Sequence, residues 1–284
     1  MTIHMNLRKI VLVCHPSQAN AAQTARQLAD YLRGKHIETE ILDDYRLLPQ
    51  TKQPDFCVSL GGDGTTLRCA RESAPLGLPV LAVNCGSLGF LSACEERAAQ
   101  ECLQEILDGN FQMTERLLLQ ADIERQGQKP LRGLLAFNDC LIKTAQPRAF
   151  TLRAERGGQE FKRFYGDGVI VSTPAGSTAY SLAAGGPVAE PDLNVFLLTP
   201  VCPHSLTERP LILHADSALS FTPEFKNETD RAAVSLDGQN AYELQNGDRV
   251  SLRRSEHAAR LVCAGKFDFF ARLRHKLEWG GRPC

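Results

Sequence analysis

The chain of 284 residues lacks an excess of charge of either sign and any long apolar run. Its 32 Lys and Arg residues against 33 Asp and Glu residues give a formal net charge of −1. A protein that neutralises many phosphates needs a basic excess, so this balance argues against a nucleic-acid partner. No apolar run approaches the ~20 residues that span a bilayer, so we expect no membrane partner. The first residues, MTIHMNLRKIVLVC, have no small-residue cleavage site, so we expect no signal peptide.

The spacing of a zinc site is absent as well. None of the ten cysteines stands in a C-x-x-C pair, and the seven histidines are scattered along the chain. Cys14, Cys57 and Cys263 lie in apolar runs, where a free cysteine behaves as a small buried hydrophobe. Free thiols fit a reducing compartment, so we expect a cytoplasmic protein, and we assign no metal ligand.

The first third of the chain alternates strand and helix patterns. We expect strands at residues 9–14, 38–42, 56–60 and 80–83, and helices at 19–33, 66–73 and 95–107. Such alternation predicts a parallel sheet covered by helices. From Thr114 to Ala264 the chain instead offers many short β-prone runs separated by GG, NG and DG turns, with one helix expected at residues 177–184.

These patterns predict two domains joined without a flexible linker. Residues 1–113 form an α/β domain with a parallel sheet, and residues 114–265 form a β-rich domain. Residues 266–284 are a tail with a helix over 267–277. A cleft between two domains is the default ligand site.

The run GGDGT, Gly61 to Thr65, follows the third expected strand. Gly61, Gly62 and Gly64 let a phosphate approach the main chain, and a helix starting at Thr65 would aim free N–H groups at it. Asp63 can hold a metal ion, orient a hydroxyl or accept its proton. The run has neither the Walker spacing nor the G-x-G-x-x-G fingerprint, because Leu67 occupies the third glycine's place. The alternative interpretation is a tight turn with Asp63 as a helix cap.

Three later segments add polar groups. NCGSLGFL, Asn84 to Leu91, is a second strand-to-helix loop that would border the same crevice, unless Leu88, Phe90 and Leu91 serve only the core. Asn138 and Asp139 supply donors and acceptors to a base or ribose, although such a pair is also common in turns. In the run from Gly166 to Pro187, Ser177 can cap a helix, and its hydroxyls suit a phosphate or sugar.

In this order, GGDGT, NCGSLGFL, FNDC and GDGVIVSTPAGSTAYSLAAGGP resemble the bacterial NAD kinases of the ATP-NAD kinase family. The later VCPHSLTERPL, SLDGQ and KLEWGGR are similar to that family too. The resemblance implies a two-domain fold whose final helix packs back on the N-terminal domain. It implies transfer of the γ-phosphoryl of ATP to the 2′-hydroxyl of the adenosine ribose of NAD. It also implies a divalent cation such as Mg²⁺ and a homodimer or homotetramer.

Carried over by position, the resemblance implies that Asp63 is the catalytic general base. It implies a phosphate loop of Gly61, Gly62, Gly64 and Thr65. It implies that NAD is bound by Asp63, Gly64, Asn138, Asp139, Arg148, Tyr165, Asp167, Thr178, Ala179, Tyr180, Ser181, Leu182, Ala183 and Gln239.

The chain departs from the family pattern at three positions. Asp139 is one methylene shorter than the usual glutamate, Tyr165 precedes a Gly-Asp-Gly that often follows serine or arginine, and Ala183 replaces a common serine. The loss of an arginine before Asp167 removes one phosphate contact, and Arg148 is an alternative source of that charge.

Three other functions compete with the kinase. GGDGT is shared with lipid kinases, but no exposed apolar entrance is evident. A dinucleotide sensor would keep Asn138 and Tyr180 but would tolerate loss of Asp63. An oxidoreductase would need a G-x-G-x-x-G, which the chain lacks. The presence of Asp63 favours the kinase, in which a carboxylate takes the ribose proton late in a loose transition state.

Overall fold

The computed structural model describes residues 7–15, 18–86, 89–265 and 267–280. The chain divides into two compact units, Met1–Glu115 with Ala258–Cys284 and Arg116–His257. Two long strands, β6 (Phe111–Glu124) and β17 (Arg249–Ala264), carry the chain from one unit into the other. The second unit is therefore an insertion between two segments of the first.

The first unit is built on a parallel sheet. Its strands are β1 (Lys9–Cys14), β2 (Glu38–Leu42), β3 (Phe56–Gly61), β4 (Pro79–Asn84) and the short β5 (Cys94–Glu95). They stand in the order β4-β3-β1-β2, with β5 beside β4 and the end of β17 also parallel to β4. The nearly unbroken burial of β1, β3 and β4 is typical of strands covered on both faces.

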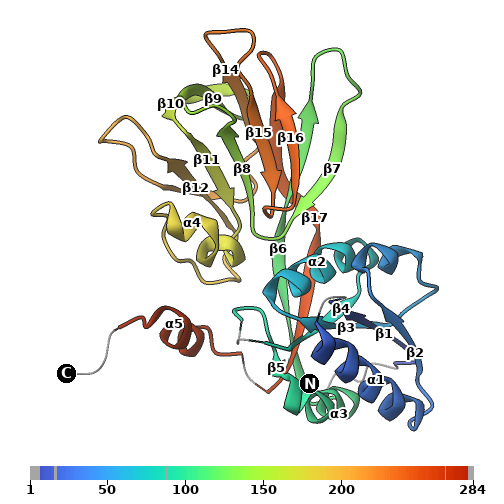
Figure 1. The fold of residues 1–284 in the computed structure, drawn as a ribbon. Coiled ribbons are helices and arrows are strands. Elements are labelled where there is room, and N and C mark those ends of the chain that lie inside the picture. Colours follow the sequence, from blue (N-terminus) through green and yellow to red (C-terminus); the bar gives the residue numbers. More distant parts are fainter. Residues whose placement is uncertain (1–6, 16–17, 87–88, 266, 281–284) are drawn as a thin grey trace. The chain divides into compact units, whose positions relative to one another are not determined.

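Helices cover both faces of this sheet. They are α1 (Ala19–Arg33), α2 (Asp63–Ser73) and α3 (Ala99–Leu107). The unit also contains α5 (Phe269–Leu277) and the 3₁₀ turns η1 (Tyr45–Gln50), η2 (Ala74–Leu76) and η3 (Glu96–Ala98). One core joins α1 and α3 to alternate residues of the strands, such as Ile10, Leu12 and Phe56. Figure 1 shows α2 on the opposite side of the strands, where it packs against β3 and β4.

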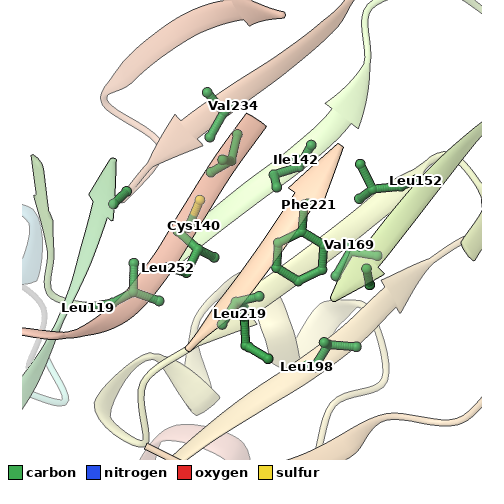
Figure 2. Packing of buried hydrophobic residues seen from close by; sticks show 14 of the residues in the cluster. Leu119, Cys140, Ile142, Leu152, Val169, Leu198, Leu219, Phe221, Val234 and Leu252 are labelled. Atoms are coloured by element: carbon green, nitrogen blue, oxygen red, sulfur yellow. The ribbon is translucent and has the colours of Figure 1, made fainter. Parts of the chain in front are cut away.

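The second unit consists of antiparallel strands. They are β7 (Leu131–Ala136), β8 (Asp139–Thr144), β9 (Phe150–Arg156), β10 (Gln159–Gly166), β11 (Gly168–Ser172), β12 (Val195–Val201), β13 (Leu211–His214), β14 (Leu219–Glu224), β15 (Ala232–Leu236) and β16 (Asn240–Leu244). One sheet has the order β13-β12-β11-β8-β15-β16, and a second contains β10-β9-β14-β17 with β6 and β7. A single core joins them, including Ile142, Val169, Phe221 and Leu252 (Figure 2).

The predicted fold class is confirmed: an α/β unit with a parallel sheet and a β-rich unit. The strands at 9–14 and 38–42 and the helix at 19–33 have the bounds expected from the sequence. The β-prone runs of the sequence did not include β8, β10, β14 and β16. Strands β10 and β16 lie at sheet edges, where strands carry polar residues and lose the apolar alternation that identifies buried ones, whereas β8 and β14 lie inside their sheets.

Three helix predictions were wrong in detail. Helix α2 begins at Asp63 rather than at Thr65, because extended Gly62 is its N-cap and accepts from the N–H groups of Thr65 and Thr66. The helix expected at 95–107 begins only at Ala99, after β5 and η3. The helix expected at 177–184 is two short pieces, η4 (Ala175–Thr178) and α4 (Tyr180–Ala183), because Ala179 leaves the helical region with φ −95° and ψ −134°.

Candidate functional site

The GGDGT loop joins β3 to α2 and has two different kinds of glycine. At Gly61 a Cβ atom would lie 2.6 Å from Oγ1 of Thr65, so this glycine is needed for packing of the first helical turn. At Gly62 and Gly64 no described atom lies within 4 Å of such a Cβ. These two positions leave room for a ligand, as expected for a loop that lets a phosphate approach the backbone.

The side chain of Asp63 connects this loop to the second one. The N–H of Phe90 donates to Oδ2 of Asp63 (2.7 Å), and the N–H of Leu91 donates to Oδ1 (3.1 Å). Asp63 is the first residue of α2, and its carboxylate is not the helix cap. The two loops therefore meet, as the sequence predicted, and the meeting point is the half-buried Asp63 carboxylate. Phe90 and Leu91 are themselves half-buried, and Leu88 lies outside the described residues.

Gly89 makes this contact possible. A Cβ atom at Gly89 would lie 1.8 Å from Oδ1 of Asp63, which no side chain can tolerate. The absence of a side chain therefore lets the loop backbone reach the carboxylate. Sequence reasoning identified Gly89 only as part of a compact turn.

A cavity of about 530 Å³ lies next to the GGDGT loop in the first unit. It is lined by Val13, Cys14, His15, Asp43, Asp44, Tyr45, Arg46, Thr65 and Arg68. The guanidinium of Arg68 lies 5.3 Å from the centre of the Tyr45 ring, and its buried Nε has no partner among the described residues. The cavity lies at the carboxyl ends of β1 and β2, beside the place where the strand order reverses around β1, the usual ligand site of an open α/β sheet.

In the second unit, Asn138 and Asp139 are held by a carboxylate that sequence reasoning missed. The N–H groups of Phe137, Asn138 and Asp139 donate to Asp237, at 3.0, 2.7 and 3.3 Å. In return, the N–H of Asp237 donates to the carbonyl of Asp139 (2.9 Å). The signal was the SLDGQ motif, of which only Gln239 was selected. Asp237 has a φ of 54°, and the Gly238 that follows has a φ of 64°, so this turn depends on the left-handed region.

Asp139 is the most strongly perturbed carboxyl group of this site. It is 5% exposed. Burial, and then the nearby charge of Asp237, raise the pKa of Asp139 to about 7. Asp139 is therefore partly protonated at neutral pH, so that it can donate as well as accept a hydrogen bond.

The run from Ser172 to Ala183 packs against Asn138. The hydroxyl of Thr173 donates to the carbonyl of Phe137 (2.6 Å), and its N–H donates to the carbonyl of Asn138 (2.8 Å). A Cβ at Gly176 would lie 2.1 Å from that same Asn138 oxygen. Ser177 does not cap a helix, because its hydroxyl is bonded to the backbone of Ala189.

The predicted binding residues in this run differ in exposure. Ser181 is fully buried, and its hydroxyl lies 3.0 Å from that of Thr199, an interaction of the interior. Tyr180 is 43% exposed, and Ala183 is exposed as well. Thr178, Ala179, Leu182 and Gln239 are half-buried. We name Asn138, Asp139, Gln239 and residues 178–183 the Asn138 group.

Arg148, Tyr165 and Asp167, the Arg148 group, lie elsewhere in the second unit. They line a cavity of about 480 Å³ together with His204, Phe225 and Lys226, which sequence reasoning missed. The Tyr165 and His204 rings meet edge to face, 4.9 Å apart. Gly168, which follows Asp167, pairs with Lys143, whereas Ser172 at the other end of β11 pairs with Asp139. The four strand steps from Gly168 to Ser172 span about 14 Å along β11.

The described residues offer no preformed metal site. They contain no group of three or more His, Cys, Asp or Glu side chains that could hold a metal ion. In the same part of the chain, no helix is long and apolar enough to cross a membrane.

Comparison with known proteins identifies a family. The model of the ATP-NAD kinase N-terminal domain matches residues 46–111, and that of the ATP-NAD kinase C-terminal domain matches residues 138–264. A NAD kinase of Geotalea daltonii is 35% identical and one of Koribacter versatilis 36%, each covering 97% of this chain and 100% of the relative. One of Heliobacterium modesticaldum is 37% identical, over 95% of this chain and 98% of the relative.

Two solved structures share the fold. Yeast NADH kinase complexed with NADH has a TM-score of 0.87 at 22% identity, over 99% of this chain and 90% of the other. An NAD kinase from Archaeoglobus fulgidus in complex with ATP has a TM-score of 0.75 at 24% identity, over 95% of this chain and 98% of the other.

Proposed function

The chain belongs to the ATP-NAD kinase family, a family of phosphotransferases that form NADP from NAD and ATP, and from this premise we propose which of its residues carry the transfer. The reacting groups are the γ-phosphoryl of ATP and the 2′-hydroxyl of the adenosine ribose of NAD. The observation that carries the proposal is the position of Asp63. A carboxylate with a fixed orientation lies beside Gly62 and Gly64, the two loop positions with room for a ligand.

Asp63 acts on the ribose hydroxyl. A carboxylate has about four lone-pair sites, and the N–H groups of Phe90 and Leu91 use two of them. A remaining site accepts the hydrogen bond of the hydroxyl and takes its proton late, as the bond to phosphorus forms. Because the transition state is loose, orientation and neutralisation of charge contribute more than early deprotonation.

The donor nucleotide occupies the cavity lined by His15, Tyr45 and Arg68. Its volume of about 530 Å³ lies in the usual range for small-molecule sites. Thr65, at the first turn of α2, lines the same cavity, so phosphates that enter from it reach the start of a helix. The buried Nε of Arg68, without a partner among the described residues, is a free donor for an anionic group.

Magnesium enters with the donor nucleotide. Mg²⁺ is usually held by one or two carboxylates together with waters and substrate phosphates, and rarely by a cage of protein groups. The donor set of the described residues fits this use, since it contains no cluster of three or more ligating side chains. We therefore treat magnesium–ATP as the substrate, in which the cation neutralises phosphate charge.

The Asn138 group binds the acceptor dinucleotide. Asn138 and Asp139 offer amide and carboxyl groups to a base or ribose, and Asp237 fixes their backbone through three N–H donors. Tyr180 is exposed enough to stack on an aromatic ring.

The enzyme is an oligomer of two or four copies in the cytoplasm. The Arg148 group supports the oligomer, because it lies at the opposite end of β11 from the Asn138 group and lines a cavity of its own. Arg148, Tyr165 and Asp167 then contact the dinucleotide bound mainly by another copy.

The variant Asp63→Asn tests the role of this residue. We expect turnover, followed as NADP formed from ATP, magnesium and NAD, to fall by about 10²–10⁴-fold, the range typical of a lost general base. NAD affinity, measured by calorimetry, should change far less. Wild-type turnover in the variant would disprove the role of Asp63.

Asp55→Asn is the matched control. Asp55 is also half-buried, and its carboxylate also accepts two backbone N–H groups, from Arg8 (2.7 Å) and Lys9 (2.8 Å). The control loses the same kind of structural hydrogen bonds away from the GGDGT loop. We expect it to lower the melting temperature and to leave turnover unchanged, so an equal loss of turnover in both variants would assign the effect to structure.

A further inference from the structure

The last described helix, α5, holds the loop that contacts Asp63. In this helix Nη1 of Arg272 donates to the carbonyls of Gly89 (2.8 Å) and Phe90 (3.3 Å), and Nη2 donates to the carbonyl of Ser92. Three carbonyl oxygens within four residues therefore accept from one guanidinium. The planar fork of arginine suits this arrangement, and a single ammonium group does not.

Two of these carbonyls belong to the peptide groups that bind Asp63. The peptide between Gly89 and Phe90 accepts from Arg272 with its oxygen and donates to Oδ2 of Asp63 with its N–H. The next peptide, between Phe90 and Leu91, accepts from Arg272 and donates to Oδ1 of Asp63. The cation and the carboxylate are thus joined through two consecutive peptide groups. Hydrogen bonds in such a chain polarise and strengthen one another.

We propose that Arg272 is a positioning residue of the phosphoryl transfer, which orients the Asp63 carboxylate through the two peptide groups between them. This inference rests on the proposed function of Asp63. Arg272 itself touches neither the substrate nor the reacting atoms. Without it the two N–H groups lose polarisation and the backbone loses its anchor, so the carboxylate adopts its reactive orientation less often.

The surroundings of Arg272 hold its charged guanidinium group in one place. Burial lowers the pKa of Arg272, and the negative charge of Asp63 only partly offsets this. Arginine nevertheless stays charged in proteins, so the cation is present in a partly desolvated place. Its guanidinium also lies 5.0 Å from the centre of the Phe267 ring. The helix is held independently, since Asp268 caps its first turn (2.9 Å to the N–H of Ala271) and Leu273 is buried.

The test compares Arg272→Ala and Arg272→Lys with Arg274→Ala, a control of the same residue type at an exposed position of the same helix. We expect Arg272→Ala to lower kcat by roughly 10- to 100-fold, the cost of a small misplacement of a reacting group, with KM for NAD changed less than about twofold. Arg272→Lys should recover part of the loss, because it keeps the charge without the fork. The control should keep wild-type kinetics.

The same substitution in the Asp63→Asn background separates orientation of Asp63 from a general structural role. If Arg272 acts through Asp63, adding Arg272→Ala to Asp63→Asn lowers the residual rate by less than about twofold. If Arg272→Ala lowers the rate by the same factor in the wild type and in Asp63→Asn, the inference is overturned. So would wild-type kcat in Arg272→Ala.

Two further readouts keep these outcomes distinct. Trp279 is the only tryptophan of the chain, and its ring lies 6.3 Å from that of Phe270 in α5. The emission of Trp279 should be unchanged in Arg272→Lys. A red shift of this emission together with a lower kcat in Arg272→Lys would show that the helix has detached, and would overturn the inference. If the wild-type protein forms no NADP, the proposed function fails. If the wild type is active and Arg272→Ala is equally active, only the inference about Arg272 fails.

Discussion

Three carboxylates of this protein, those of Asp63, Asp237 and Asp139, differ in their hydrogen-bond donors and in their burial. Asp63 and Asp237 both accept backbone N–H groups from a loop distant in sequence, and each thereby fixes the backbone of that loop. Asp139 is instead enclosed by the core, where burial disfavours its charged form. The structure thus contains one carboxylate that we propose as the proton acceptor, one that holds the backbone and one whose protonation changes near neutral pH.

Asp139 should make stability depend on pH. Its pKa in the folded protein is about 7, above its ordinary value of 3.8. Between these pH values the folded state holds a proton that the unfolded state has lost, so the free energy of unfolding falls as pH rises and levels off above pH 7. The full penalty is on the order of 4 kcal/mol.

The variant Asp139→Asn lacks this titration. Without nucleotide, we expect the wild type to lose roughly 2–3 kcal/mol relative to the variant between pH 5 and pH 8, measured by urea unfolding. Parallel pH profiles for the two proteins would contradict the raised pKa of Asp139.

Two of the thiols, Cys85 and Cys140, are protected rather than reactive. Burial raises the pKa of Cys140, which is fully buried, and raises that of Cys85 to about 11. A thiol with a raised pKa is a poor nucleophile at neutral pH. We therefore expect Cys85 and Cys140 to resist oxidation at neutral pH.

At the scale of elements, glycines decide how closely two segments approach. The 3₁₀ turn η4 meets the carbonyl of Asn138 at Gly176, and the loop before β5 meets Asp63 at Gly89. At both glycines a neighbouring group occupies the space that a Cβ atom would need. The close packing of these segments thus depends on single residues that carry no functional group.

Gly176→Ala should disturb the Asn138 group. The added methyl group would lie 2.1 Å from the carbonyl oxygen of Asn138, so the turn or the Asn138 segment must move. We expect stability to fall by about 1–3 kcal/mol and KM for NAD to rise by roughly 10-fold or more.

Gly64→Ala is the comparison for stability, because no described atom lies within 4 Å of its added methyl group. Its melting temperature should stay at the wild-type value. An unchanged KM for NAD in Gly176→Ala would show that the turn does not position the dinucleotide site.

At the scale of the whole molecule, each unit has its own core. Residues from β6 to β17 form one cluster and residues of α1, α3 and the parallel strands form the other. The candidate residues divide between them: Asp63 and the cavity lined by His15, Tyr45 and Arg68 belong to the first unit, and the Asn138 and Arg148 groups belong to the second. We propose that the reaction needs a second copy.

Mixing two inactive variants tests the contribution of the second copy. Asp63→Asn lacks the proposed base, and Asp167→Ala lacks a member of the Arg148 group. If the Arg148 group serves the site of another copy, mixed oligomers contain sites with an intact Asp63 and an intact Asp167. We expect NADP formation to reappear after the two proteins are unfolded and refolded together. Activity that stays at the level of the separate variants would place both residues in the site of one copy.

The sequence by itself determined the fold class, the parallel strands at 9–14 and 38–42, and the glycine loop with Asp63. These follow from apolar periodicity and local turn chemistry, which act over a few residues. Only the tertiary structure decided what holds the candidate residues in place. The hydrogen bonds that do so join Phe90 to Asp63, Asp237 to Asn138, and Arg272 to Gly89. The partners in these hydrogen bonds are separated by 27, 99 and 183 positions. Such contacts have no local pattern, because they form only when the folded chain brings distant loops together.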